Sequence, residues 1–300
     1  MGDYGRELEF GASVEPLAEP ADWTASIART ADQAGLDLIG IQDHPYQRRF
    51  LDTWTLISTL VPQTEQVRFF PDVANLPLRP PAMLAKAAAS LDVLSGGRIE
   101  VGLGAGAFWE AVAAMGGPRR SPGEAVRATE EAIKVMRLAW SEERTVRFDG
   151  EFYALSGMRP GPRPVHHIGI WVGAYGPRML SLIGRLADGW VPSLAYSPPE
   201  KLPEMQRRID DSAAKAGRDG REIRRIYNLS GKIGPDHRGL LDGPKDHWAE
   251  ELARFALDLG VDTFIYWPSE DHARQIELFA NEVAPAVREL VEAERAQTIT

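Results

Sequence analysis

An acid and an imidazole stand side by side at Asp43 and His44, directly after a short apolar run at 38–42. A histidine in such a place can exchange protons near neutral pH. Glu15 and Glu110 also follow short apolar runs and are further candidate acids. We take these four as candidate catalytic residues. A histidine that packs against the next loop, and glutamates that are solvated loop carboxylates, remain the alternative interpretations.

Glycines mark a second candidate site. Gly102, Gly104 and Gly106 alternate at the end of the apolar run 99–103. Alternate glycines remove side chains where something large and flat could lie against the backbone. The dinucleotide-binding fingerprint G-x-G-x-x-G is absent, because the third glycine comes one position too early, at 106, and Ala occupies position 107. Glycine also simply ends strands, so the run by itself indicates a cofactor only weakly.

A third feature is the Gly173-Ala174-Tyr175-Gly176 turn, which precedes a helical stretch at 177–187. The free amides of such a turn and the helix dipole together attract anions. We therefore expect a phosphate group of a ligand to bind here. The alternative is a short loop that needs glycine for its geometry.

Composition limits the classes of function. The net charge of −9 and the pI near 5.3 argue against a nucleic-acid partner. The absence of cysteine excludes disulfides and thiolate chemistry, and no histidine spacing resembles a metal site, so no metal is expected. The chain has neither an apolar signal segment nor a run of ~20 apolar residues, which predicts a cytoplasmic protein without membrane contact.

The elements that must position these residues alternate along the chain. Eight short apolar or β-branched runs are each followed by a segment with helical periodicity, which predicts a single (β/α)8 TIM barrel domain over 1–300. An open doubly wound sheet is the structural alternative. The strand runs are 8–14, 38–42, 67–73, 99–103, 168–173, 189–192, 223–230 and 263–267. The expected helices are 20–35, 53–61, 80–94, 123–140, 177–187, 198–217, 245–259 and a final one at 269–295.

An insertion is expected between the fourth and fifth strands. It should contain a helix and a β-hairpin, because two alternating runs at 145–153 flank Asp149-Gly150. In a barrel of this kind the active site lies at the carboxyl ends of the strands. The aromatic residues Phe108, Trp109, Tyr266 and Trp267 fall at these ends and should shape an apolar pocket.

Four motifs, in this order and spacing, resemble a known family. They are Ile-Gln-Asp-His at 41–44, Val-Ala-Asn-Leu-Pro-Leu-Arg-Pro-Pro-Ala at 73–82, the glycine-rich pair at 94–98 and 102–106, and the pair at 172–177 and 184–190. The chain resembles the bacterial luciferase-like superfamily. It is most similar to the coenzyme F420 (deazaflavin) oxidoreductases, in particular the methylenetetrahydromethanopterin reductases. The same motifs also occur in members that use FMN.

The resemblance implies that a deazaflavin or flavin ring lies in the barrel mouth. A cis peptide bond, expected at Pro71–Asp72, would bulge against one face of the ring, and the glycines at 102–106 would thin the wall so that the ring can enter. The implied partners are a small-molecule substrate and a second copy of the chain in a homodimer. The implied cofactor-binding residues are Asp43, Pro71, Asp72, Val73, Asn75, Gly104, Gly106, Gly173, Ala174, Tyr175, Gly176 and Pro192.

The function implied is hydride transfer between coenzyme F420 and a small organic substrate. One departure from the family concerns the deazaflavin glucose-6-phosphate dehydrogenases, which carry a catalytic glutamate where this chain has Ala107. An FMN-dependent monooxygenase of the same superfamily and a non-catalytic ligand-binding barrel remain open as alternatives.

Overall fold

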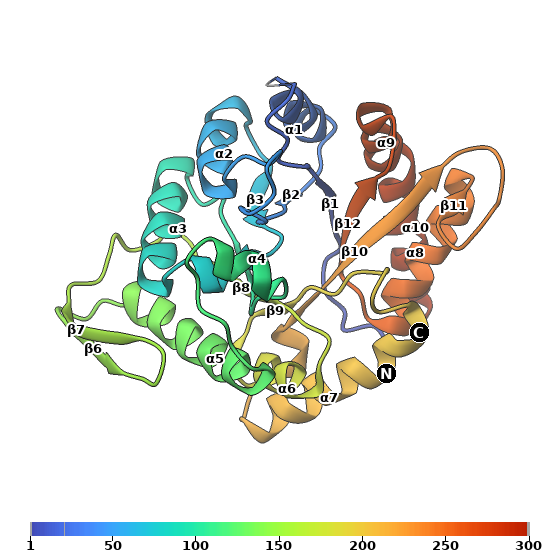
Figure 1. Ribbon diagram of the computed structural model, residues 1–300. Helices are drawn as coiled ribbons and strands as arrows, with labels where there is room; N and C mark the ends of the chain where they lie inside the picture. Colours follow the sequence, from blue (N-terminus) through green and yellow to red (C-terminus); the bar gives the residue numbers. More distant parts are fainter. Residues whose placement is uncertain (1, 21, 299–300) are drawn as a thin grey trace.

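A mostly parallel sheet, wrapped into a nearly closed barrel, confirms the predicted fold class in this computed structural model, which describes residues 2–20 and 22–298 (Figure 1). The sheet order is β3-β2-β1-β12-β10-β9-β8-β5-β4. A parallel bridge joins Phe69 of β3 to Ile99, which directly precedes the β5 segment, and so brings the two sides of the sheet together. The barrel strands are β1 (Glu9–Ser13), β2 (Leu38–Ile41), β3 (Arg68–Pro71), β4 (Ala74–Asn75), β5 (Val101–Gly104), β8 (Ile170–Gly173), β9 (Gly189–Trp190), β10 (Arg224–Ile233) and β12 (Thr263–Pro268).

Helices surround the barrel and cover the outer faces of its strands (Figure 1). Their ends follow the sequence signals: Ser121 and Glu124 form a capping box at the start of α5, and Gly260 ends α8 in the left-handed conformation. The predicted final helix is interrupted by a π-helical turn at Phe279–Val283. The helices are α1 (Trp23–Gln33), α2 (Thr53–Leu60), α3 (Pro81–Ser95), α5 (Pro122–Ala139), α6 (Pro177–Leu186), α7 (Leu202–Lys215), α8 (Lys245–Leu259), α9 (His272–Leu278) and α10 (Ala284–Thr298). No helix in the described part of the chain is long and apolar enough to cross a membrane.

Between β5 and β8 lie α4 (Trp109–Ala114), α5 and an antiparallel pair, β6 (Val146–Asp149) and β7 (Ala154–Met158). The expected second strand begins later than the sequence suggested. The reason is that the Glu131 carboxylate accepts hydrogen bonds from the amides of residues 151–153, which holds them in a loop.

The third barrel strand is split in two. The predicted run 67–73 forms β3, and β4 begins after a break at residues 72–73. The cis peptide bond is at Asp72–Val73 and not at Pro71–Asp72, so that expectation was wrong by one residue. The Asp72 amide still donates to the Ile41 carbonyl at 2.7 Å, which continues the pairing with β2 past Pro71. The ladder therefore breaks one peptide later than expected.

The barrel interior is apolar through its middle. One side chain from each of several strands fills it, in the layered manner of this fold. The buried members of this cluster are Leu38, Phe70, Trp171, Val191, Ile226 and Ile265. Polar groups that belong to the barrel are thereby confined to its two ends.

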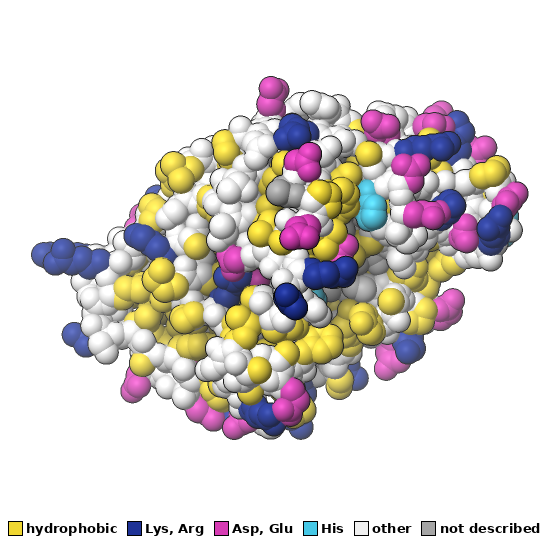
Figure 2. All heavy atoms as spheres, turned by 45° about the horizontal axis from the view of Figure 1, so that its top comes forward, with side chains coloured by type: hydrophobic (Ala, Val, Ile, Leu, Met, Phe, Trp, Pro, Cys, Tyr) yellow, Lys and Arg dark blue, Asp and Glu magenta, His cyan; other side chains and the backbone are white. Residues whose placement is uncertain are grey.

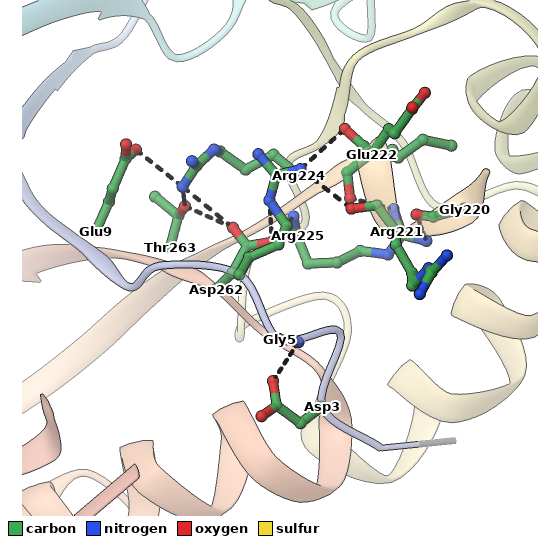
Figure 3. Close-up of polar contacts among 12 residues, drawn as sticks. Asp3, Gly5, Glu9, Gly220, Arg221, Glu222, Arg224, Arg225, Asp262 and Thr263 are labelled. Atoms are coloured by element: carbon green, nitrogen blue, oxygen red, sulfur yellow. Dashed lines mark hydrogen bonds and ion pairs between the residues drawn. The ribbon is translucent and has the colours of Figure 1, made fainter. Parts of the chain in front are cut away.

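The amino ends of the strands are held by a network of paired charges (Figure 3). The Arg224 guanidinium lies 3.0 Å from the Glu9 carboxylate and donates to Thr263 at 2.8 Å. Arg68 in turn bridges Glu9 and Glu100, both at 2.7 Å. Every charge in this chain of contacts has an opposite partner, so this end of the barrel is suited to stability and not to binding.

His166 is part of the same end and predicts a pH dependence of stability. Its hydrogen bond to Glu100 and the charges of Glu100 and Asp92 raise its pKa. The charged imidazolium therefore stabilises the fold fully below the ordinary histidine pKa, and this contribution is lost as pH rises through the raised value. We expect His166→Gln to lower the unfolding free energy by on the order of 1 kcal/mol near pH 5.5 and by much less near pH 9, measured by urea denaturation.

The control for this experiment is His167→Gln. The side chain of His167 is 73% exposed, so its replacement should change stability little at either pH. Equal losses for His166→Gln at both pH values would contradict the assignment.

Candidate active site

The carboxyl ends of the barrel strands form a face on which hydrophobic side chains gather between charged groups (Figure 2). We call this end of the barrel the mouth. Its loops expose large aromatic side chains, among them Phe108 at 56% and Tyr175 at 44%. Exposed aromatics clustered on one face are typical of a surface that binds an apolar or flat ligand.

Val73 projects into the wall between β5 and β8. A Cβ at Gly104 would lie 2.7 Å from Val73 Cγ2, one at Gly102 would lie 3.0 Å from Val73 Cγ1, and one at Gly173 would lie 3.2 Å from Val73 Cγ2. We call Gly102, Gly104 and Gly173 the glycine recess. Val73 of this chain therefore occupies the space beside Gly102 and Gly104, where the ring was expected to enter.

Gly106 lies in the loop that follows β5, outside the glycine recess. Its φ of +100° is a conformation that side chains other than glycine rarely adopt. A Cβ there would also lie 2.7 Å from both Pro77 and the Trp109 ring. The third glycine of the run is therefore required by the turn and by close packing.

Asp43 is buried and fully engaged with its neighbours. Arg79 donates two hydrogen bonds to its carboxylate, both at 2.6 Å, and the Asn75 amide donates a third at 2.8 Å. Arg79 also contacts Asp52 at 2.6 Å, and its pKa is raised because these carboxylate partners outweigh the effect of burial. This arrangement ties the end of β2 to β4 and gives both oxygens of the Asp43 carboxylate a hydrogen-bond donor.

His44 has a different environment from its neighbour. Its Nδ1 lies 2.7 Å from the Tyr46 hydroxyl, and its ring contacts the rings of Tyr46 and Phe108. Desolvation lowers the pKa of His44, against a smaller opposing effect of Asp43. Burial also raises the pKa of Tyr46 to about 12. The imidazole is therefore mainly neutral at neutral pH, and with Nδ1 bonded to Tyr46 its Nε2 is the nitrogen left for a ligand.

The other two candidate acids, Glu110 and Glu15, have fewer contacts than Asp43. The Glu110 side chain is 82% exposed and pairs with Arg119. Glu15 is partly buried, in the segment that follows β1. Tyr266, expected in the pocket wall, is fully buried, and its hydroxyl donates to Gln275 of α9. Its side chain therefore points outward from the barrel, and that expectation was wrong.

The expected phosphate site lies where α6 begins. Gly176 is the N-cap residue of α6, and no side chain caps the first turn. A Cβ on Gly176 would meet nothing within 4 Å, so the backbone there is open to approach. Ala174 is buried and its carbonyl accepts a hydrogen bond from the Trp190 indole, which fixes the turn, whereas Tyr175 is exposed.

Several buried polar atoms at the mouth have no hydrogen-bond partner among the described residues. Buried polar groups in proteins are nearly always paired, so such a cluster calls for an explanation. A ligand in the mouth would supply the missing partners. These atoms are Asp72 Oδ2, Asn75 Oδ1, Asn228 Oδ1 and Trp267 Nε1.

Sequence reasoning missed Asn228 and Ser193 as site residues. Asn228 lies on β10, and its side chain contacts Asp72 from across the barrel. The Pro192 carbonyl accepts the Asn228 amide at 3.0 Å, so Pro192 supports this residue from behind. The two-residue spacing from Ile226, an interior residue, could have placed Asn228 on the inner face of the strand.

The glycine recess predicts a compensating pair of substitutions. Gly104→Ala places a methyl group against Val73 and should destabilise the fold by about 1–3 kcal/mol, as overpacking usually does. Val73→Ala removes the opposing methyl groups, so Gly104→Ala should cost at least 1 kcal/mol less in that background. Chemical denaturation of the wild type, both single variants and the double variant measures this coupling. Strictly additive effects would rule out the contact.

Asp43 and Asp52 both form ion pairs with Arg79, so replacing each in turn gives a matched pair of variants. Asp43→Asn should cost about 3 kcal/mol, because it removes the buried one of the two carboxylates that pair with a largely buried guanidinium. Asp52→Asn should cost less than about 1 kcal/mol, because the Asp52 side chain is 43% exposed. Urea unfolding of both variants checks the difference. Similar losses would show that Asp43 does not anchor the mouth.

Comparison with known proteins gives two informative relatives. One is the 5,10-methylenetetrahydromethanopterin reductase of Archaeoglobus fulgidus, 31% identical over 199 residues, which cover 63% of this chain and 54% of the reductase. The chain thus matches about half the length of that relative. The other is the F420-dependent glucose-6-phosphate dehydrogenase of Gordonia bronchialis, 25% identical over 95% of this chain and 98% of the relative.

Two solved structures share the fold. An F420-dependent secondary alcohol dehydrogenase aligns with a TM-score of 0.84 at 20% identity, over 94% of this chain and all of that one. The FMN-bound oxygenating constituent of 3,6-diketocamphane monooxygenase from Pseudomonas putida aligns with a TM-score of 0.76 at 19% identity, over 93% and 99% of the two chains. Residues 8–286 match the family described as luciferase-like monooxygenase. With this match over most of its length, the chain belongs to the luciferase-like family, whose members include enzymes that use coenzyme F420 or FMN.

Proposed function

We propose that this protein is an oxidoreductase that transfers a hydride between coenzyme F420 and a small organic substrate. The observation that carries the proposal is that Val73 packs against the glycine recess. Beside it lie buried polar atoms that have no hydrogen-bond partner among the described residues. A flat ring with polar edges suits both features, since its face can pack on Val73 and its edge can bond to the polar atoms. Relatives named as F420-dependent enzymes support the choice of coenzyme.

The residues of the mouth fit a deazaflavin coenzyme in distinct ways. Val73 would support one face of the ring, and Asn75 would bond to a polar edge. The uncapped amides of the turn from Gly173 to Gly176 would bind the phosphate, with the α6 dipole adding to the attraction. Gly104, Gly106, Pro71 and Pro192 would act indirectly, by shaping the wall and loops that these groups need.

Coenzyme F420 would supply the carbon that carries the hydride. The chain's part is to hold the reactants and to manage the proton that accompanies hydride transfer. His44 is the residue placed for this, because its ring is neutral and Tyr46 fixes it through Nδ1. Asp43 would act as a positioning residue, by fixing the backbone from which His44 projects. Glu15 and Glu110 remain candidate acids in this proposal, with weaker support.

An FMN-dependent monooxygenase is the second candidate. It is favoured by the fold's likeness to the FMN-bound constituent from Pseudomonas putida. Nothing in the recess distinguishes a flavin from a deazaflavin ring, because the two have the same outline. We also propose that the chain works as one domain over residues 1–300, in a cytoplasmic homodimer.

Equilibrium titration of the purified protein with coenzyme F420 and with FMN tests the proposal. We expect F420 to bind with micromolar affinity or better, and at least about tenfold more tightly than FMN, which corresponds to about 1.4 kcal/mol. His44→Asn should keep most of this affinity, because its role is to handle the proton. It should lower the rate of hydride transfer between F420 and a small organic substrate that the wild type turns over by about 10²-fold or more.

The alternative has its own readout. Oxygen consumption with reduced FMN, together with FMN binding tighter than that of F420, would replace the proposed coenzyme by FMN. Binding of neither coenzyme would refute both candidate functions.

A further inference from the structure

Asp72 and Asn228 form a pair of buried side chains at the base of the mouth, which we call the floor pair. Asp72 is 8% exposed and Asn228 is 7% exposed. They come from opposite parts of the barrel, β10 and the break between β3 and β4, and meet above the apolar interior.

The contacts of the floor pair are incomplete. Asn228 Nδ2 donates to Asp72 Oδ1 at 3.2 Å and to Ser193 Oγ at 3.3 Å. Asp72 Oδ2 and Asn228 Oδ1 remain buried without a partner among the described residues. Gly40 lies against Asp72 on the side of β2, where a Cβ would be 3.1 Å from Oδ2. Each member thus keeps one polar atom to offer to a ligand.

The charge state of Asp72 follows from its surroundings. Burial raises its pKa to about 7, and Asn228 opposes this only in part. Among the described residues, the elements packed against it present no cation to it: β2 presents Gly40, β10 presents Asn228, and the segment after β9 presents Ser193. Tyr175, after β8, is the titratable group that interacts with it. Below neutral pH the carboxyl is thus mostly uncharged, with one O–H to donate.

We propose that the floor pair is a subsite for a lactam or imide edge of the bound ring, in which Asp72 donates to a ring carbonyl and Asn228 Oδ1 accepts from the adjacent ring N–H. This inference rests on the proposed function, since it assumes a ring coenzyme in the mouth. One donor beside one acceptor is the complement of a C=O beside an N–H. A phosphate or carboxylate does not fit here, because it offers only acceptors to a pair that also needs a donor.

The protonation of Asp72 separates this subsite from a cation site. A lactam edge needs the O–H, so binding should weaken as pH rises through the pKa of Asp72. An ammonium group needs the carboxylate, so binding should strengthen over the same range. The direction of the pH dependence therefore identifies which kind of ligand the floor pair accepts.

The test uses the whole protein and measures dissociation constants by fluorescence titration. The probes are 5-deazariboflavin and its N3-methyl derivative, which lacks the ring N–H. For the wild type we expect the affinity for 5-deazariboflavin to fall about 25-fold between about pH 6.5 and pH 8.5, since the protonated fraction of a group with a pKa of about 7 falls by that factor over this range. Asp72→Asn keeps a donor that does not titrate, so it should bind with a flat profile. Because the ligand and His44 are common to both proteins, the ratio of the two profiles isolates Asp72.

Two further variants sharpen the result. Asp52→Asn makes the same acid-to-amide change outside the mouth floor, so its profile should parallel that of the wild type. The wild type should prefer the unmethylated probe by about tenfold, and Asn228→Ala should lose that preference. Thermal unfolding of each variant establishes that it is folded.

The outcomes distinguish the two levels of proposal. Binding with the same pH profile in wild type and Asp72→Asn, a profile that rises with pH, or equal affinity for both probes would each overturn the floor pair as a lactam subsite and leave the proposed function standing. Failure of the wild type to bind 5-deazariboflavin, F420 and FMN alike would overturn the proposed function and the subsite with it.

Discussion

The seating of Val73 in the glycine recess is the constraint on which the mouth depends. The side chain enters the barrel wall where Gly102, Gly104 and Gly173 leave no Cβ. Protein interiors are close-packed, so this position is available only because β5 and β8 are bare at the matching points. Once Val73 is fixed, the residues on either side of it are fixed as well. Asp72 is directed into the barrel, and β4 restarts in register with β5.

The two ends of the barrel differ in how their buried polar groups are paired. At the amino ends Glu9, Arg68 and Arg224 lie within one network of opposite charges. At the mouth, atoms of Asp72, Asn75 and Asn228 are buried without a hydrogen-bond partner in the described part of the chain. Leaving such groups unpaired costs free energy in the absence of a ligand, typically ~1–3 kcal/mol for each. The well-paired end helps the fold to tolerate that cost.

The alternation of apolar runs and helical periodicity was sufficient to predict the barrel, because each strand and helix is a local pattern that repeats. The glycines could be located in the sequence, but the sequence did not show that Val73 fills the space beside them. Which side chain fills a recess depends on packing between β3, β5 and β8, and these strands are far apart in the chain. The one-residue error in the cis bond has the same origin, since only the pairing of Asp72 with Ile41 shows where the ladder ends.

The adjacent residues Asp43 and His44 illustrate why a motif does not assign roles by itself. Asp43 meets Arg79 and the Asn75 amide, which satisfy its carboxylate, while the His44 ring contacts Tyr46 and Phe108. Rigid attachment of the first is what gives the second a defined position over the mouth. In the proposed reaction, the proton chemistry that the pair suggested as a unit would fall to His44, and Asp43 would contribute through the geometry that its contacts maintain.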